Sequence, residues 1–259
     1  MERITSKNNP SVMAAAKLSD KKYREKEGVF AFEGIKLFRE AVQNGAQIRR
    51  VFVTEDAFEK YGEVLLCVGE EKIFIVSDAV YEKLSFENAP QGVFTVAEYF
   101  SPKPKEDISL VLLLDGVADP GNFGAILRSA DAFAIDAVYA GKNGADLYNP
   151  KTVRACMGSL FRVDVRRAAS IEEEVLRLKA GGFRIYATTL NESSKDIREV
   201  DLSGKIGFVI GNEGHGVSEA VIAACTGSVI IPMREGPESL NAAVASSVVM
   251  WEAARTRLK

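Results

Sequence analysis

Short hydrophobic runs alternate with amphipathic stretches along the whole chain. In the first hundred residues the pattern predicts strands at 29–32, 51–53, 73–76 and 93–96, and helices at 10–18 and 35–43. Further along it predicts strands at 110–114, 137–140, 184–188, 206–210 and 228–231, and helices at 123–133, 150–157, 171–179, 217–224 and 240–258. This alternation is typical of an α/β protein whose parallel sheet is covered by helices on both faces.

One segment between these two series breaks the pattern. Residues 101–107 read Ser-Pro-Lys-Pro-Lys-Glu-Asp, and two prolines among charges continue neither a helix nor a central strand. We therefore expect a linker there and two domains, residues 1–100 and residues 106–259. The first domain is expected to be a small α/β sandwich that includes a polar, basic stretch at residues 21–26.

Three loops marked by glycine and asparagine follow strands of the second domain. They read DGVADPGNFGAILRSADAF (115–133), FVIGNEGHGVSEAV (208–221) and IIPMREGPESLNAAVASSVVMWEA (230–253). Ligands of open parallel sheets bind beyond the carboxyl ends of the strands. Because each loop begins where an apolar run stops, we expect a ligand site among them.

The glycines of these loops favour some ligands over others. No GxGxxG turn follows the first strand of the second domain, and no GxxxxGK[ST] loop is present, which disfavours a dinucleotide or a nucleoside triphosphate. A plain turn explains one glycine, whereas Gly211, Gly214 and Gly216 all lie within six residues. Glycine lets the backbone approach a ligand closely or take φ > 0. The three glycines indicate a ligand-binding loop of another kind.

Charge is unevenly distributed along the 259 residues, whose net charge is −3. Residues 1–50 carry eleven Lys and Arg against six Asp and Glu (+5), residues 51–100 three against ten (−7), and residues 151–200 ten against seven (+3). Local basic character suits contact with nucleic-acid phosphates, although a basic stretch is often only a solvated face. No apolar run approaches the ~18 residues of a membrane span, and the first residues lack a signal peptide, so a cytoplasmic location is expected.

Two residue types limit the available chemistry. His215 is the only histidine, which excludes a histidine-rich metal site and leaves no second imidazole for catalysis. We expect it to be a loop residue near the ligand. Cys67, Cys156 and Cys225 form no CxxC pair, which argues against a zinc site and a disulfide framework. Buried free thiols are expected, and no metal.

Taken together, the three loops resemble the motifs of a known enzyme family. DPGNFGAILRSAD, IGNEGHG and IPM…ESLNAAVA, within residues 110–254, are similar in order and content to the motifs of the SpoU branch of the SPOUT methyltransferases. The resemblance implies an enzyme that transfers methyl from S-adenosyl-L-methionine to a ribose 2′-hydroxyl of RNA without a metal. It also implies a SPOUT-type α/β fold with a deep trefoil knot, and a homodimer formed through the region of the C-terminal helix.

The first domain resembles the substrate-binding domain that precedes many SpoU catalytic domains, which is itself similar to ribosomal proteins that bind kinked RNA. The matching pieces are ITSKNNP, KKYREKEGVFAFEG and APQGV. This implies an RNA substrate, with large-subunit ribosomal RNA favoured and tRNA as the alternative. Glu33 and Gly34 in the second piece are explained equally well as a strand-to-helix turn or as RNA contacts.

The same resemblance assigns residues to the site. Arg128 would act on the 2′-hydroxyl, and because a guanidinium has a pKa above ~12, orienting the hydroxyl and stabilising developing charge is its expected role. Glu213 would bring a carboxylate into the site, where one role for it is pairing with Arg128. Asn122, Ser239 and Asn241 complete the catalytic set, although Asn122 and Ser239 are also explained as helix caps. The implied cofactor-binding residues are Thr188, Leu190, Gly211, Asn212, Gly216, Ile231, Met233 and Leu240.

Two other kinds of function remain open. A non-catalytic RNA-binding or ribosome-assembly protein could keep this fold, but it has no need of Arg128, Glu213, Ser239 and Asn241 together. A Rossmann-type nucleotide enzyme is disfavoured by the missing glycine fingerprint. Arg154, in the stretch Arg-Ala-Cys-Met-Gly, is either a contact to RNA phosphate or an exposed charge on a helix.

Overall fold

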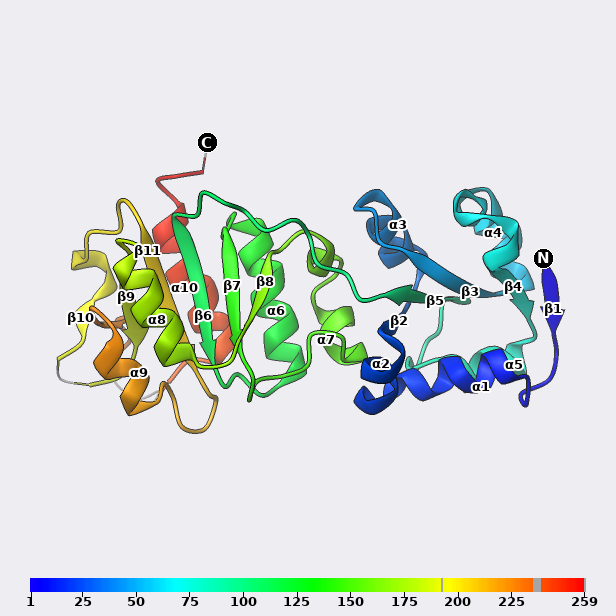
Figure 1. The fold of residues 1–259 in the computed structure, drawn as a ribbon, viewed down its shortest axis with the longest axis horizontal. Coiled ribbons are helices and arrows are strands. Elements are labelled where there is room, and N and C mark those ends of the chain that lie inside the picture. The colour runs from blue at the N-terminus through cyan, green and yellow to red at the C-terminus, as the bar shows by residue number, and fades with distance from the viewer. Residues whose placement is uncertain (192, 235–238, 259) are drawn as a thin grey trace. The chain divides into compact units, whose positions relative to one another are not determined.

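The structure is a computed structural model that describes residues 1–191, 193–234 and 239–258. The chain divides into two compact units, one formed by Met1–Ser101 with Asp146–Phe161 and the other by Pro102–Ala145 with Arg162–Lys259. Each unit has its own sheet and its own hydrophobic core (Figure 1). Within the described residues, no helix is long and apolar enough to cross a membrane.

The first unit holds a mixed five-stranded sheet. Its strands lie in the order β1 (Glu2–Ile4), β4 (Ile73–Val76), β3 (Ile48–Thr54), β5 (Val93–Glu98) and β2 (Val29–Glu33). β5 runs antiparallel to β2 and β3, while β4 is parallel to β1 and β3. Figure 1 shows helices on both sides of this sheet, α1 (Pro10–Ala16), α2 (Lys21–Glu27) and α5 (Asp78–Leu84) on one side and α3 (Ile35–Gln43) and α4 (Glu55–Leu65) on the other. A short helix, α7 (Pro150–Ala155), packs against β2.

The polar stretch at residues 21–26 forms a helix because both of its ends are capped. The Asp20 carboxylate accepts a hydrogen bond from the Lys22 N–H at 2.9 Å. Gly28 ends the helix in the left-handed region, at φ +64°, and its N–H donates to the Arg24 carbonyl. Periodicity alone does not predict this helix, since it has little apolar face.

A buried ion pair holds residues 146–161 to the first unit. Arg24 is 1% exposed, and its guanidinium donates to the Leu18 and Ser19 carbonyls at 2.7 and 2.8 Å and to the Asp146 carboxylate at 2.5 Å. Losing one partner of a buried pair costs ~3–5 kcal/mol, because the other charge is left uncompensated. Asp146 is therefore tied to the first unit, although it follows a strand of the second in sequence.

The second unit holds a seven-stranded sheet in which every pairing is parallel. Its order is β10 (Lys195–Asp196), β12 (Gly227–Ile230), β9 (Arg184–Thr188), β11 (Ile206–Gly211), β6 (Leu110–Asp115), β7 (Ala137–Gly141) and β8 (Val165–Ala168). Helices α6 (Pro120–Ala132) and α10 (Ala242–Ala254) pack together on one face, and α8 (Ile171–Ala180) and α9 (Glu219–Ala224) pack together on the other (Figure 1). Central β6 reads Leu-Val-Leu-Leu-Leu-Asp and is buried over its apolar residues, as expected when both faces are covered.

The hydrophobic pattern predicts the long apolar elements of this fold better than the elements that are short or carry many charges. Strands β4 and β9 and helix α3 have the predicted bounds, and the other predicted elements are present with shifted ends. Helix α10 ends at Ala254 rather than at residue 258. The pattern misses α2, α4, α5, β1, β8 and β10. Strands β1 and β10 are too short to show alternation, and β8 carries two arginines in four residues.

The cysteines are free thiols with two different environments. Cys156 and Cys225 are buried, and burial raises the pKa of Cys225 to about 11. Cys67 is exposed, so the expectation of a buried thiol is wrong at that position. It lies in a 3-10 turn, Leu66–Val68, that follows α4 and contains no buried residue.

Candidate active site

Three strand ends of the second unit enclose a cavity of about 600 Å³. It lies beyond the carboxyl ends of β9, β11 and β12, and the segment leading into α10 forms part of its wall. This volume falls within the ~300–1,000 Å³ of typical small-molecule sites. The lining residues are 188–191, 210–217, 222, 229–231, 233, 239–242 and 245.

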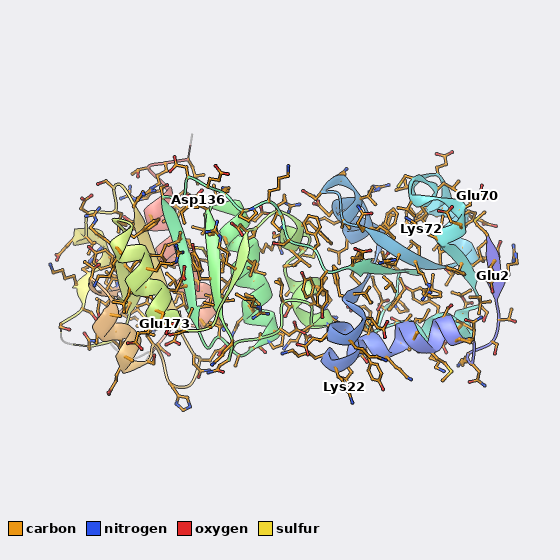
Figure 2. The ribbon with its side chains drawn as sticks, viewed as in Figure 1. Glu2, Lys22, Glu70, Lys72, Asp136 and Glu173 are labelled. Carbon is orange, nitrogen blue, oxygen red and sulfur yellow. The ribbon has the colours of Figure 1, made fainter. Side chains whose placement is uncertain are left out.

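At the amino ends of the strands, on the opposite edge of the same sheet, the polar side chains make hydrogen bonds within the protein. Asp136, before β7, accepts hydrogen bonds from the Ser109 and Leu110 N–H groups at 2.9 and 3.0 Å and from Lys105 Nζ at 3.0 Å. Burial opposes its charge, but these bonds prevail and hold the pKa of Asp136 below its usual value. Figure 2 shows Asp136 and Glu173 at opposite ends of the sheet. Glu173 lies in α8, which follows the carboxyl end of β8. A hollow of about 690 Å³ lies at the Asp136 edge, but the Arg257 guanidinium there is engaged by Ser109 and two carbonyls.

Of the three glycines in and after the end of β11, Gly211 and Gly216 occupy positions that need glycine, and Gly214 does not. A Cβ on Gly211 would lie 2.0 Å from the Gly216 carbonyl carbon and 2.1 Å from the Val217 nitrogen. Asn212 and Gly216 exchange two backbone hydrogen bonds, at 3.0 and 2.8 Å, and Gly216 has φ +71°. Gly214 has no such constraint, since a Cβ there would lie 3.5 Å from the Asn212 side chain. The close approach of two backbone segments therefore requires Gly211.

The Asn212 side chain joins this loop to the loop after β6. Its Nδ2 donates to the Gly116 carbonyl at 2.8 Å, while its Oδ1 accepts from the Gly214 and His215 N–H groups at 2.9 and 3.2 Å. The amide is therefore engaged at both ends. It orders the turn in which the glycines lie.

Glu213 makes a second link between the same two loops. Its carboxylate accepts hydrogen bonds from the Ala118 N–H at 3.0 Å, the Asp119 N–H at 3.1 Å and Asn122 Nδ2 at 2.9 Å. Burial opposes the charge, but the Asn122 amide and the backbone N–H groups outweigh it and lower the pKa of Glu213. The group is a carboxylate at neutral pH.

Asn122 extends this link to the third loop. Its Oδ1 accepts from Asn241 Nδ2 at 3.0 Å, so Asn241, Asn122 and Glu213 form one chain of hydrogen bonds across residues far apart in sequence. Asn241 is itself the N-cap of α10, and accepts from the Ala243 and Val244 N–H groups at 2.9 and 3.3 Å. We call these three residues the polar chain.

Two capping roles differ from the ones considered from sequence. Asp119, not Asn122, is the N-cap of α6, and it accepts from the Asn122 N–H at 2.8 Å. Asn241, not Ser239, caps α10. Asn122 therefore lies inside the first helical turn, and its side chain is free to bridge Glu213 and Asn241.

Arg128 lies further along α6 and does not line the cavity. Its side chain is exposed, and within residues 1–191, 193–234 and 239–258 it has neither an ion-pair partner nor a hydrogen-bond partner. The suggested pairing with Glu213 is wrong in this structure, because Ala118, Asp119 and Asn122 engage that carboxylate instead. The guanidinium is accessible to an anionic ligand.

The structure brings most of the sequence-predicted residues to one place. All eight residues predicted to bind cofactor line the cavity, as do Glu213, Ser239, Asn241 and His215. One residue that holds the site was not predicted. The Asp115 carboxylate, at the end of β6, accepts from the Ser218 N–H at 2.9 Å. An acidic residue ending a buried strand was the available signal for Asp115.

Two candidate RNA contacts of the first unit are engaged in internal bonds. The Glu33 carboxylate accepts from the Tyr81 and Ser85 hydroxyls at 3.1 and 2.8 Å and from the Phe86 N–H at 2.5 Å. Burial, together with Glu33, raises the pKa of Tyr81. Arg154 pairs with Glu87. These bonds favour the structural explanation for Glu33 and give Arg154 a partner within its own unit.

Two family profiles match the chain. The profile described as the SpoU rRNA Methylase family matches residues 109–251, which include the cavity and the polar chain. The chain belongs to the SpoU rRNA methylase family. A profile described as the MRM3-like substrate binding domain matches residues 9–95 of this family member.

Similar proteins agree with this membership over nearly the whole chain. The 23S rRNA (guanosine(2553)-2'-O)-methyltransferase RlmP of Bacillus subtilis is 31% identical over 256 residues, 97% of this chain and 98% of the relative. The AdoMet-bound rRNA methyltransferase from Sinorhizobium meliloti has a TM-score of 0.87 at 29% identity, covering 100% of this chain and 99% of that one. The SpoU methyltransferase AviRb from Streptomyces viridochromogenes, in complex with AdoMet, has a TM-score of 0.86 at 29% identity, covering 96% and 98%. The family and the α/β fold class expected from the motifs are confirmed, and this SpoU chain is a methyltransferase.

Proposed function

We propose that this chain transfers a methyl group from S-adenosyl-L-methionine to a ribose 2′-hydroxyl of large-subunit ribosomal RNA. The observation that carries this proposal is the polar chain from Asn241 through Asn122 to Glu213, which ties the three family motifs together beside the cavity. Family membership supports the reaction, and the relative that methylates 23S rRNA supports the substrate.

The cavity suits S-adenosyl-L-methionine in size and lining. Its volume of about 600 Å³ is bounded by apolar side chains, including Ile231, Met233 and Leu240, and by backbone of the loop after Gly211. Apolar walls with a few polar groups are usual for such ligands. We assign the adenosine end to Thr188, Leu190 and Met233, and backbone contacts to Gly211, Asn212, Gly216, Ile231 and Leu240. When bound, the ligand supplies an electrophilic methyl group on a sulfonium.

The chain's own residues then have to hold the acceptor ribose. Arg128 is cationic and exposed in the second half of α6, which suits contact with an RNA phosphate or a developing alkoxide. It is a poor base, so its proposed role is to orient the 2′-hydroxyl and to stabilise negative charge. Glu213, Asn122 and Asn241 fix the relative positions of the three loops, and Ser239 lines the cavity beside them.

The substrate class is tested by incubating the protein with tritiated S-adenosyl-L-methionine and separated RNAs from cells that lack it. We expect label in large-subunit rRNA and none in small-subunit rRNA or tRNA. Label in tRNA alone would replace the substrate in this proposal. No label despite measurable cofactor binding to the protein, with ribosomal particles also unlabelled, would favour a non-catalytic RNA-binding role.

We also propose that the protein acts in the cytoplasm as a homodimer formed through α10. Val244, Val248 and Trp251 recur at helical spacing on this helix and are 49%, 37% and 50% exposed, and the Trp251 ring lies 5.7 Å from that of Phe133. A row of exposed apolar side chains of this size suits burial against another subunit. Sedimentation velocity should give the mass of a dimer; a monomer at micromolar concentration would contradict this.

A further inference from the structure

The first unit carries a hollow that the proposed reaction does not use. It has a volume of about 860 Å³ and lies between α1, α2 and the adjoining ends of β2, β3 and β5. We call it the basic groove. Its lining residues are Pro10, Met13, Ala14, Ala15, Lys17, Leu18, Tyr23, Lys26, Glu27, Val29, Arg49, Arg50 and Val96. Four of them are cationic and one is anionic.

A β-bulge places two of these cations side by side. The pairing of β3 with β5 shifts between Ile48, opposite Ala97, and Arg50, opposite Val96, so Arg49 is an additional residue in the strand. In a regular strand, neighbouring side chains point to opposite faces, whereas a bulge re-aims them. Arg49 and Arg50 are both exposed at the groove. The bulge is thus a means of presenting paired positive charge.

Two of the cations have no carboxylate partner among the residues that the structure describes. Arg49 pairs with Glu98 at 2.6 Å, and Lys26 lies 3.7 Å from Glu27. Within the described part of the chain, neither Lys17 nor Arg50 has an ion pair. Lys17 Nζ instead lies 5.3 Å from the centre of the Tyr23 ring, a cation–π contact that holds the ammonium at the groove. Unpaired cations are available to phosphates without first breaking an internal bond.

The charge of the first unit is segregated between the two sides of its sheet. Helix α4 carries four carboxylates against one lysine and lies on the side away from α2, which carries four cations against two carboxylates. Figure 2 shows Lys22 on the side of α2, and Glu70 and Lys72 on the opposite side. A polyanion is therefore attracted to one side and repelled from the other.

We infer that the basic groove binds a single-stranded segment of the RNA substrate, with Lys17 and Arg50 contacting its phosphates. The inference rests on the proposed function, since RNA is the polyanion that this protein must hold. A half-buried tyrosine among lysines and arginines is typical of sites that follow a single strand. The groove lies almost wholly inside the stretch that matches a substrate binding domain, residues 9–95, and assigns that role to particular side chains.

The test compares full-length variants in binding a fluorescein-labelled oligouridine at several salt concentrations. The double variant Lys17→Ala/Arg50→Ala removes two proposed phosphate contacts. It should bind roughly tenfold more weakly, and the slope of log affinity against log salt should fall by roughly 1.4. The control Lys22→Ala/Lys72→Ala removes the same charge outside the groove and should keep the wild-type slope. Arg50→Lys keeps the charge and should retain most of the affinity.

Methylation of large-subunit rRNA separates this inference from the proposed function. If the wild type transfers methyl, the groove variant should show a raised KM for RNA, an unchanged kcat and unchanged cofactor affinity. A groove variant with wild-type slope and KM would overturn the inference and leave the proposed function standing. An equal loss in the Lys22/Lys72 control would also overturn it, because binding would then follow total charge. If the wild type transfers no methyl to any RNA, the proposed function fails. The oligouridine comparison then still tests whether Lys17 and Arg50 bind RNA.

Discussion

The cavity of the second unit and the basic groove of the first unit hold their ligands in different physical ways. Beside the cavity, Gly211 is fixed by a close backbone approach, and the Asn212 and Glu213 side chains are fixed by hydrogen bonds to the backbone of the loop after β6. In the groove, Lys17 and Arg50 lack ion-pair partners within the described residues. The cavity is pre-organised, so a single substitution in its loop should disrupt it. The groove acts through charge, so each cation should contribute a part of the affinity and salt should weaken binding.

The largest effect should follow from adding one methyl group to the loop after β11. Gly211→Ala places a Cβ 2.0 Å from backbone, a clash that no side-chain rotation relieves. We expect cofactor affinity, measured by calorimetry, to fall by about 100-fold or more, which is about 3 kcal/mol. Gly214→Ala is the matched control, and should bind nearly as the wild type does. If the two variants behaved alike, the loop would not be the rigid element described here.

A smaller loss, confined to the chemical step, is expected for Arg128. Arg128→Ala should lower kcat by about 100-fold at most, the low end for removal of a group that stabilises developing charge, because its side chain is exposed to solvent. Cofactor affinity should remain unchanged, because Arg128 does not line the cavity. Single-turnover methyl transfer measures the first quantity and calorimetry the second. Wild-type turnover in this variant would remove Arg128 from the mechanism.

The smallest of the three effects should come from neutralising Glu213. Glu213→Gln keeps the shape of the side chain but turns one acceptor into a donor, which faces either the Ala118 N–H or the Asp119 N–H. We expect a loss of about 3- to 10-fold in kcat/KM for RNA at neutral pH, since charge-assisted bonds are replaced by weaker ones. Steady-state methylation assays would measure it.

The same substitution should change the pH dependence of the site. The folded-state pKa of Glu213 lies below its ordinary value of 4.5, so its contribution is fully present above pH 4.5 and is lost as pH falls through the folded pKa. Cofactor affinity of the wild type should therefore weaken in that acidic range, and that of Glu213→Gln should change less. Parallel curves for the two proteins would show that Glu213 does not control the loop.

These contrasts also show how far the sequence could predict the site. Gly211 and Gly216 were predictable, because glycines at the end of a buried strand indicate a close backbone approach or a positive φ at those positions. The link between Glu213 and Asn122 joins residues 91 positions apart, and no local pattern reports it. The same holds for the capping of α6, where Asp119 and Asn122 are both good candidates and only the fold selects Asp119.

The fold shows the same division between local and long-range information. Long apolar runs such as β6 and β11 were predictable because burial on both faces leaves a continuous hydrophobic signal. Helix α2 was not, since its caps and the buried Arg24–Asp146 pair, rather than an apolar face, stabilise it. The assignment of residues 1–100 to RNA binding and 106–259 to catalysis stays a prediction, as does the threading of a trefoil knot through the second unit.

The central claim is that the cavity at the carboxyl edge of the second unit directs methyl to a ribose oxygen. Alkaline hydrolysis of large-subunit rRNA labelled by this protein with tritiated S-adenosyl-L-methionine tests it most directly, because a 2′-O-methyl group blocks cleavage at the adjacent phosphate. The account predicts label in an alkali-resistant dinucleotide, and its loss with Gly211→Ala. Label recovered in a mononucleotide would place the methyl on a base and contradict the claim.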